Sequence, residues 1–120
     1  MDGVFAREFE PLGRAVEIGI ASGSVISVSF PADADDAADG QHPLFDRLDA
    51  YLGGSSDHFD DVEIALTVPT DHRQVLEATR NVPYGETVSL DRVVRMAGLD
   101  PDDDAARATA RTALAENPIP

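Results

Sequence analysis

Residues 73–98 read RQVLEATRNVPYGETVSLDRVVRMAG, and this stretch decides the architecture of the second half of the chain. Both of its ends carry apolar residues at three- and four-residue spacings, which is the period of a helix. Pro83 and Gly85 interrupt that period, because proline lacks a backbone donor and glycine favours turns. Ser89 is a typical N-cap for the second run, and Gly98 ends it. The stretch therefore predicts two helices separated by a turn.

A third helix is predicted downstream, over residues 103–116, before the chain reaches Asn-Pro-Ile-Pro at 117–120. Three helices, the last two joined by a short turn, outline a helix-turn-helix, in which the final helix enters a groove of DNA. Three short helices also form an ordinary small bundle. The period alone leaves both interpretations open.

The last predicted helix is rich in alanine and carries two arginines. Its small side chains allow close approach to a groove or to another helix, and Arg107 and Arg111 lie on one face, four residues apart. In the alternative interpretation the alanines pack internally and the arginines pair with the carboxylates of residues 102–104.

The first half has the pattern of a sheet with one helix. Apolar residues alternate with polar ones in VFARE, RAVEIGIA and SVISVSF, which predicts strands, and the ASGS turn between the second and third indicates an antiparallel hairpin. A helical period runs from Pro43 until Gly53 and Gly54 end it, and DDVEIALTV at 60–68 predicts another strand. We therefore expect an α+β protein, with a sheet-and-helix lobe over residues 1–68 and a helical lobe over 69–120.

Several kinds of catalytic or metal site lack support in the sequence. The Asp-rich loop that begins at Asp33 does not fit an EF-hand, because its twelfth position is Leu44 rather than Glu. The histidines at 42, 58 and 72 have no triad or zinc spacing, and we expect them on the surface. The absence of cysteine excludes thiolate ligands and cysteine nucleophiles from these 120 residues. We expect no metal and no cofactor.

Charge is the most unusual bulk property. The chain has 23 acidic residues against 9 basic ones, all of them arginine, for a net charge of -14. Such a surface repels DNA and anionic lipid in dilute buffer, and it resembles the surfaces of proteins from salt-loving cells, where this repulsion is screened. A solvated acidic surface without environmental meaning is the alternative. No apolar run is long enough to span a membrane and the first residues do not form a secretory signal, so we expect a cytoplasmic protein. We also expect a monomer.

Residues 73–98, followed by AARATARTALAENPIP, resemble the DNA-binding half of the alkylguanine-DNA alkyltransferases, also called methylated-DNA-protein-cysteine methyltransferases. PYGETVS and the Asn-Pro-Ile-Pro run are the most specific pieces. Upstream, the hairpin, HPLFDRLDAYLGG and VEIALTVPTDHRQVL follow the order of the family's first domain. The resemblance implies a ribonuclease-H-like lobe over 1–68 and a winged-helix-like DNA-binding lobe over 69–120.

The family flips an alkylated guanine out of duplex DNA and transfers its alkyl group irreversibly to a cysteine of the protein. That cysteine lies in a Pro-Cys-His-Arg motif shortly after the Asn-Pro-x-Pro segment, which here is Asn117, Pro118 and Pro120 around Ile119. The resemblance makes this segment the hinge before an active site that the chain does not include. We therefore expect double-stranded DNA as the partner, no catalytic residue, and no alkyl transfer by this chain.

Two positions depart from the family pattern. Leu90 stands where the family has a tyrosine that rotates the target phosphate, and Asp91 follows it. The family's finger arginine corresponds to Arg107 by its AARA context, whereas counting back from Asn117 reaches Ala108, and one residue turns a helix by about 100°. The candidate DNA-binding residues are Ser89, Leu90, Ala106, Arg107, Ala110 and Arg111.

Three functions agree with these observations. The chain is an alkyltransferase represented by an incomplete sequence, or a non-enzymatic lesion sensor similar to the alkyltransferase-like proteins. As a third alternative, it is a remnant or interaction module without a DNA role, which the net charge and Leu90 favour.

Overall fold

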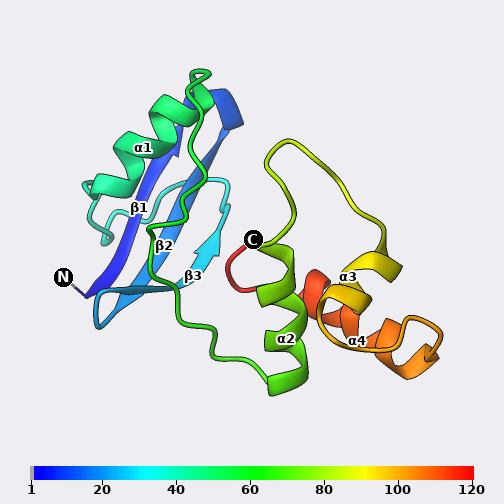
Figure 1. Ribbon diagram of the computed structural model, residues 1–120. Coiled ribbons are helices and arrows are strands. Elements are labelled where there is room, and N and C mark those ends of the chain that lie inside the picture. Colours follow the sequence, from blue (N-terminus) through cyan, green and yellow to red (C-terminus); the bar gives the residue numbers. More distant parts are fainter. Residues whose placement is uncertain (1) are drawn as a thin grey trace. The chain divides into compact units, whose positions relative to one another are not determined.

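The computed structural model describes residues 2–120 and divides the chain into two units (Figure 1). The first unit comprises Met1–Leu66 together with Pro118–Pro120, and the second comprises Thr67–Asn117. The fold is α+β, as the sequence predicts, with all strands in the first unit and three helices in the second. No helix among the described residues is long and apolar enough to cross a membrane.

A three-stranded antiparallel sheet of order β1-β2-β3 forms the centre of the first unit. Its strands are β1 (Gly3–Phe9), β2 (Arg14–Ala21) and β3 (Ser24–Ser29), with a short 3-10 helix, Glu10–Leu12, between the first two. The predicted hairpin is confirmed, because Ala21 pairs with Ser24. Ser22 and Gly23 between them both have positive φ, 51° and 80°, which is the geometry of a type I′ turn.

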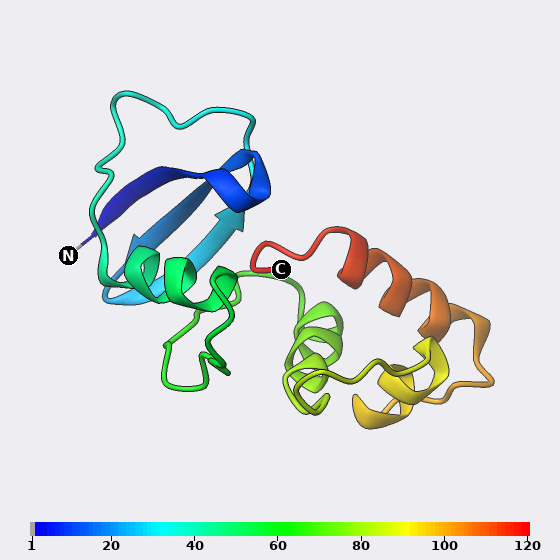
Figure 2. The same cartoon turned by 90° about the horizontal axis from the view of Figure 1, so that it is seen from above.

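Helix α1 (Pro43–Leu52) covers one face of this sheet, as Figure 2 shows from above. The helix presents Phe45, which is completely buried, and the strands present the apolar members of their alternating pattern. Because successive side chains of a strand point to opposite faces, this alternation gives the sheet one apolar side. The resulting core consists of Phe5, Phe9, Val16, Ile18, Ile20, Val25 and Phe45.

The outer edge of β3 is bound by two separate segments of the chain. Val25 donates its N–H to Glu63 O and accepts from Ala65 N, both at 2.9 Å, and Val28 donates to Pro118 O at 2.7 Å. The strand predicted over 60–68 is therefore wrong in extent, since only one bridge, Val25 to Ile64, forms. The residues before this bridge do not extend the pairing. They turn toward α1, where Asp57 and Asp61 accept hydrogen bonds from Arg47.

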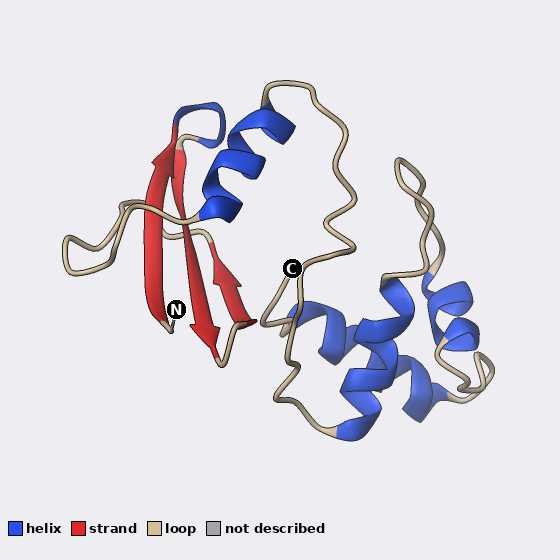
Figure 3. Ribbon diagram, turned by 60° about the vertical axis from the view of Figure 1, so that its left-hand side comes forward, coloured by secondary structure: helices blue, strands red, loops and turns tan. Residues whose placement is uncertain are grey.

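The second unit consists of α2 (Thr70–Thr79), α3 (Leu90–Met96) and α4 (Asp104–Ala115), which pack on one another (Figure 3). The helix predicted over 103–116 is confirmed with ends one residue shorter. The apolar residues that gave the helical period line the interior: Val75, Leu76, Ala78, Val93, Val94, Ala110 and Ala113. This division differs from the predicted one at 68 and 69 in two ways: the boundary falls between residues 66 and 67, and residues 118–120 lie with the first unit.

Candidate nucleic-acid interface

Helix α4 is set in place by its cap and by its small residues. Asp103 accepts a hydrogen bond from Ala105 N at 3.0 Å, which satisfies one of the free donors at the start of the helix. Ala110 is 0% exposed and Ala113 1%, so these two alanines pack against the other helices. Ala110 was predicted to contact DNA, and its burial corrects that prediction, because it has no surface to offer. Ala106 is half-buried at the border of the same face.

The two arginines of α4 have different environments. Arg107 makes an ion pair with Asp91 in the first turn of α3, and its side chain is 28% exposed. Arg111, one turn later, is exposed and makes no ion pair with any residue of 2–120. The alternative interpretation, in which these arginines pair with residues 102–104, is therefore wrong in its choice of partner: the carboxylate that binds Arg107 belongs to α3.

Ser89 and Leu90 begin α3. The Ser89 hydroxyl accepts a hydrogen bond from Arg92 N at 3.2 Å, so this side chain caps the helix, as its position predicts. Leu90 is half-buried. An apolar side chain here cannot hydrogen-bond to a phosphate, and the nearest hydroxyl in sequence is the exposed one of Ser89.

The segment predicted as a hinge, residues 117–120, lies at the second boundary between the units along the chain. Asn117 is the last residue of the second unit, and Pro118 is already hydrogen-bonded to β3. Ile119 packs against the core of the first unit, and Pro120 is exposed. Sequence reasoning missed this return to the first unit, because a single apolar residue between two prolines gives no periodic signal.

Charge divides unequally between the units. The first contains fourteen acidic residues and three arginines, a net charge of −11, whereas the second contains nine acidic residues and six arginines, a net charge of −3. Four of those nine acidic residues fall within 100–104. The rest of the second unit is therefore slightly basic, which makes it the less repulsive part of the chain toward a polyanion.

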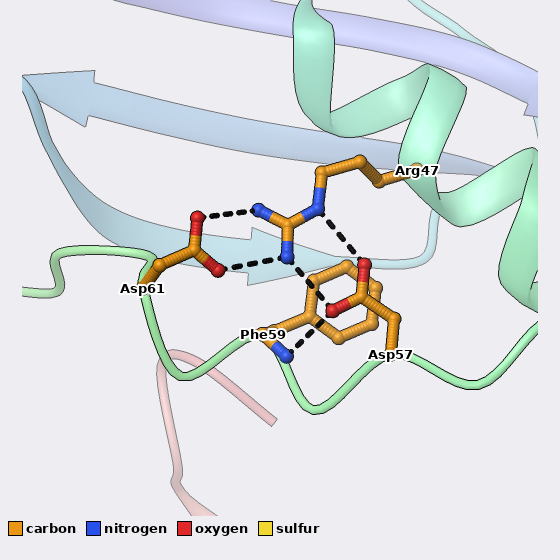
Figure 4. A network of polar contacts seen from close by, with 4 residues as sticks. All are labelled: Arg47, Asp57, Phe59 and Asp61. Carbon is orange, nitrogen blue, oxygen red and sulfur yellow. Dashed lines mark hydrogen bonds and ion pairs between the residues drawn. The ribbon is translucent and has the colours of Figure 1, made fainter.

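A polar cluster of the first unit surrounds Arg47 of α1 (Figure 4). Its guanidinium donates two hydrogen bonds to Asp57, at 2.9 and 2.7 Å, and two to Asp61, at 3.0 and 2.9 Å. It also lies 4.9 Å from the centre of the Phe59 ring. These contacts hold Phe59 at a φ of 55°, a left-handed conformation that is uncommon for an aromatic residue. The cluster fixes the segment after α1, and the spacing of its aspartates in a loop gave no sequence signal.

Hydrogen bonds and charges shift the pKa values of this cluster. The hydrogen bonds from Arg47 lower the pKa of both Asp57 and Asp61 below their ordinary range. The two carboxylates in turn raise the pKa of Arg47, so the guanidinium stays charged throughout. Ionised groups that satisfy one another in this way support structure and offer no proton for catalysis.

His42 corrects the expectation that the histidines are plain surface residues. Its Nδ1 accepts a hydrogen bond from Leu44 N at 3.1 Å and so caps α1, and its ring packs edge-on against Phe5. Burial lowers the pKa of His42 below its ordinary value of 6.5. His42 also lines two open cavities of about 430 and 600 Å³. Neither lining contains a serine, threonine or cysteine, so neither supplies a hydroxyl or thiol nucleophile.

Fold and site together define an α+β protein in which a helix-covered, three-stranded antiparallel sheet is followed by a three-helix unit that carries most of the arginines. No family model matches the chain. The chain is similar in sequence to the methylated-DNA–protein-cysteine methyltransferases of two archaea. That of Methanopyrus kandleri is 31% identical over 80 residues, 64% of this chain and 61% of the relative. That of Metallosphaera sedula is 34% identical over 76 residues, 63% of this chain and 45% of the relative.

Solved structures extend the likeness to the fold. A variant of the Mycobacterium tuberculosis O6-methylguanine methyltransferase superposes with a TM-score of 0.76 at 23% identity, over 100% of this chain and 73% of the other. The same organism's OGT in complex with DNA gives 0.75 at 24% identity, over 98% and 72%. The resemblance to the alkylguanine-DNA alkyltransferase family is thereby confirmed. The chain spans about three fifths of the first curated relative and under half of the second.

Proposed function

We propose that this chain recognises alkylated guanine in double-stranded DNA, and that α4 is the helix that contacts the duplex. The observation that carries this proposal is the similarity of fold, over 98% of the chain, to a methyltransferase whose structure is solved in complex with DNA. In the same proposal the first unit is ribonuclease-H-like, the second is winged-helix-like, and the protein binds as a monomer.

The charges of the second unit support this choice of surface. Arg107 and Arg111 lie one turn apart on α4, and Ser89 stands at the start of the neighbouring α3. Arginine forms forked hydrogen bonds with phosphate and with base edges. The net charge of -14 opposes binding as a whole, so the expected affinity is weak at low salt and depends on these few contacts.

The chemical part of the proposal is lesion recognition without alkyl transfer. The 120 residues contain no cysteine, and the attacking group in thiol alkylation is the thiolate. After incubation with a duplex that carries O6-methylguanine, mass spectrometry of the intact chain should find no mass increase. An added methyl group would contradict this. Extending the chain with the family's Pro-Cys-His-Arg segment tests the rest of the fold, because methyl transfer would then be expected.

Binding is tested by fluorescence anisotropy with duplexes that differ only in one O6-methylguanine, at several salt concentrations. Replacing both Arg107 and Arg111 by Ala should weaken binding and lower the salt slope by about two, one for each lost phosphate contact. The control replaces Arg80 and Arg95, which lie outside α4, and changes the net charge equally. If the unaltered chain binds no duplex at any salt concentration where it is folded, the proposal of DNA binding fails. The alternative of an interaction module without a DNA role then gains support.

A finger role for Arg107 gives a different result from a phosphate contact. A side chain that fills the space of a flipped base discriminates damaged from intact DNA, because flipping is least costly at a damaged pair. Arg107→Ala alone should then abolish the preference for the O6-methylguanine duplex and leave the salt slope nearly unchanged. If the unaltered chain and Arg107→Ala prefer the O6-methylguanine duplex to the same degree, Arg107 has no finger role.

A further inference from the structure

Arg107 of α4 is bound to a carboxylate whose position is fixed by the fold. Asp91 lies in the first turn of α3, two residues after the Ser89 cap, and α3 packs against α4 within the second unit. The Asp91 side chain is 56% exposed and that of Arg107 28%, so the ion pair lies at the surface and its charged ends reach solvent.

A carboxylate and a phosphate compete for the same donors. Each presents two oxygens to the fork of a guanidinium, so a phosphate that takes both donors of the Nη1 group displaces the carboxylate bound there. Asp91 occupies Nη1 of Arg107, and once that ion pair opens, the free carboxylate lies next to the anion that replaces it. An approaching phosphate therefore meets both a lost ion pair and a new repulsion.

We propose that Asp91 is an intramolecular competitor of DNA, which holds Arg107 in the free protein and must release it before Arg107 contacts the duplex. This inference rests on the proposed function. Arg111 needs no such release, because it is exposed and makes no ion pair among residues 2–120. Contact therefore begins at Arg111, and Arg107 follows in exchange for Asp91.

The decisive substitution is Asp91→Asn, which keeps the shape of the side chain and removes its charge. Its affinity for the O6-methylguanine duplex should rise about twofold to fivefold at low salt, the range that exposed ion pairs span. The gain should shrink as salt increases, since salt screens the ion pair. Glu77→Gln on α2 is the matched control, because it removes one negative charge from an exposed residue without an ion pair.

A double-mutant cycle with Arg107→Ala separates competition from general repulsion. In that background Asp91→Asn should gain no more affinity than Glu77→Gln does, because no arginine remains to be released. Asp91→Glu, which keeps the carboxylate, should bind like the unaltered chain. Circular dichroism of each variant verifies that the helices of the second unit are present.

Three results would overturn the inference. Equal gains from Asp91→Asn and Glu77→Gln would reduce the effect to net charge, and an undiminished gain without Arg107 would show that Asp91 acts elsewhere. In both cases the chain still binds DNA, and the proposed function stands. Absence of duplex binding by every folded variant would overturn the proposed function and the inference together.

Discussion

The guanidinium of Arg47 makes four hydrogen bonds to two carboxylates, and a lysine cannot reproduce them. An ammonium is a point charge, whereas the planar fork of arginine binds Asp57 on one side and Asp61 on another. We expect Arg47→Lys to loosen residues 57–61, so that the Phe59 amide, which donates to Asp57 at 2.8 Å, exchanges faster with solvent. Hydrogen exchange measures this. Arg14→Lys is the control, because Arg14 is exposed and forms no ion pair within residues 2–120. Similar exchange in both variants would contradict the prediction.

His42 makes the stability of the first unit depend on pH. Its pKa is lowered in the folded protein, so the unfolded chain binds a proton more readily. The stabilisation is therefore complete above the ordinary pKa of 6.5 and is lost as pH falls below that value. Protonation also removes the acceptor that caps α1.

His42→Asn tests this assignment, since asparagine is a good cap and does not titrate. The melting temperature of the unaltered chain should fall between about pH 7.5 and 5, whereas that of His42→Asn should fall less. Parallel curves would assign the dependence to other groups. Asp57 and Asp61 do not contribute to the pH dependence in this range. Their pKa values are lowered in the folded protein, so the stabilisation that they give is lost only as pH falls below their ordinary value of 3.8.

At the scale of the element, α4 has one face that belongs to the core and another that faces solvent. Ala110 is completely buried and Ala108, two residues earlier, is exposed. Ala110→Leu should destabilise the second unit by about 1–3 kcal/mol through overpacking, whereas Ala108→Leu should change the free energy of unfolding by less than about 0.5 kcal/mol. Chemical denaturation measures both. An unchanged free energy of unfolding in Ala110→Leu would mean that this face of α4 is not tightly packed.

Local patterns predicted the elements well and the contacts between distant segments poorly. The strands around Ile18 and the helix around Arg107 follow from periods of two and 3.6, which need only neighbouring residues. The single bridge at Ile64 and the return of Pro118 to β3 depend on segments far apart in sequence. The same holds for the site: the arginines of α4 were predictable, whereas the partner of Arg107 was not, because Asp91 lies sixteen positions earlier in the sequence.

At the scale of the whole molecule, repulsion between carboxylates outweighs the ion pairs. Only four of the fourteen acidic side chains of the first unit pair with its arginines among the described residues: Asp46, Asp49, Asp57 and Asp61. Raising KCl from about 0.1 to 1 M shortens the screening length from about 10 to 3 Å. We expect this to raise the melting temperature by about 5 °C, the shift that about 1 kcal/mol gives in a domain of this size.

A variant with fewer charges provides the control for this salt effect. Replacing Asp33, Asp35 and Asp36 by Asn removes three negative charges from one loop. This variant should melt higher than the unaltered chain at low salt and gain less from KCl. A melting temperature that falls with KCl in the unaltered chain would instead mean that ion pairs dominate.

The two segments bound to the edge of β3 give the chain the topology of an insertion. Val25 holds residues 63 and 65 before the second unit, and Val28 holds Pro118 after it. Three residues of a strand span about 10 Å, so residues 67–117 leave and rejoin the first unit at neighbouring points of one strand. A short glycine-serine linker can close such a gap at little entropic cost. The helical segment is in this sense an insertion, and replacing it by such a linker leaves every strand of the first unit uninterrupted.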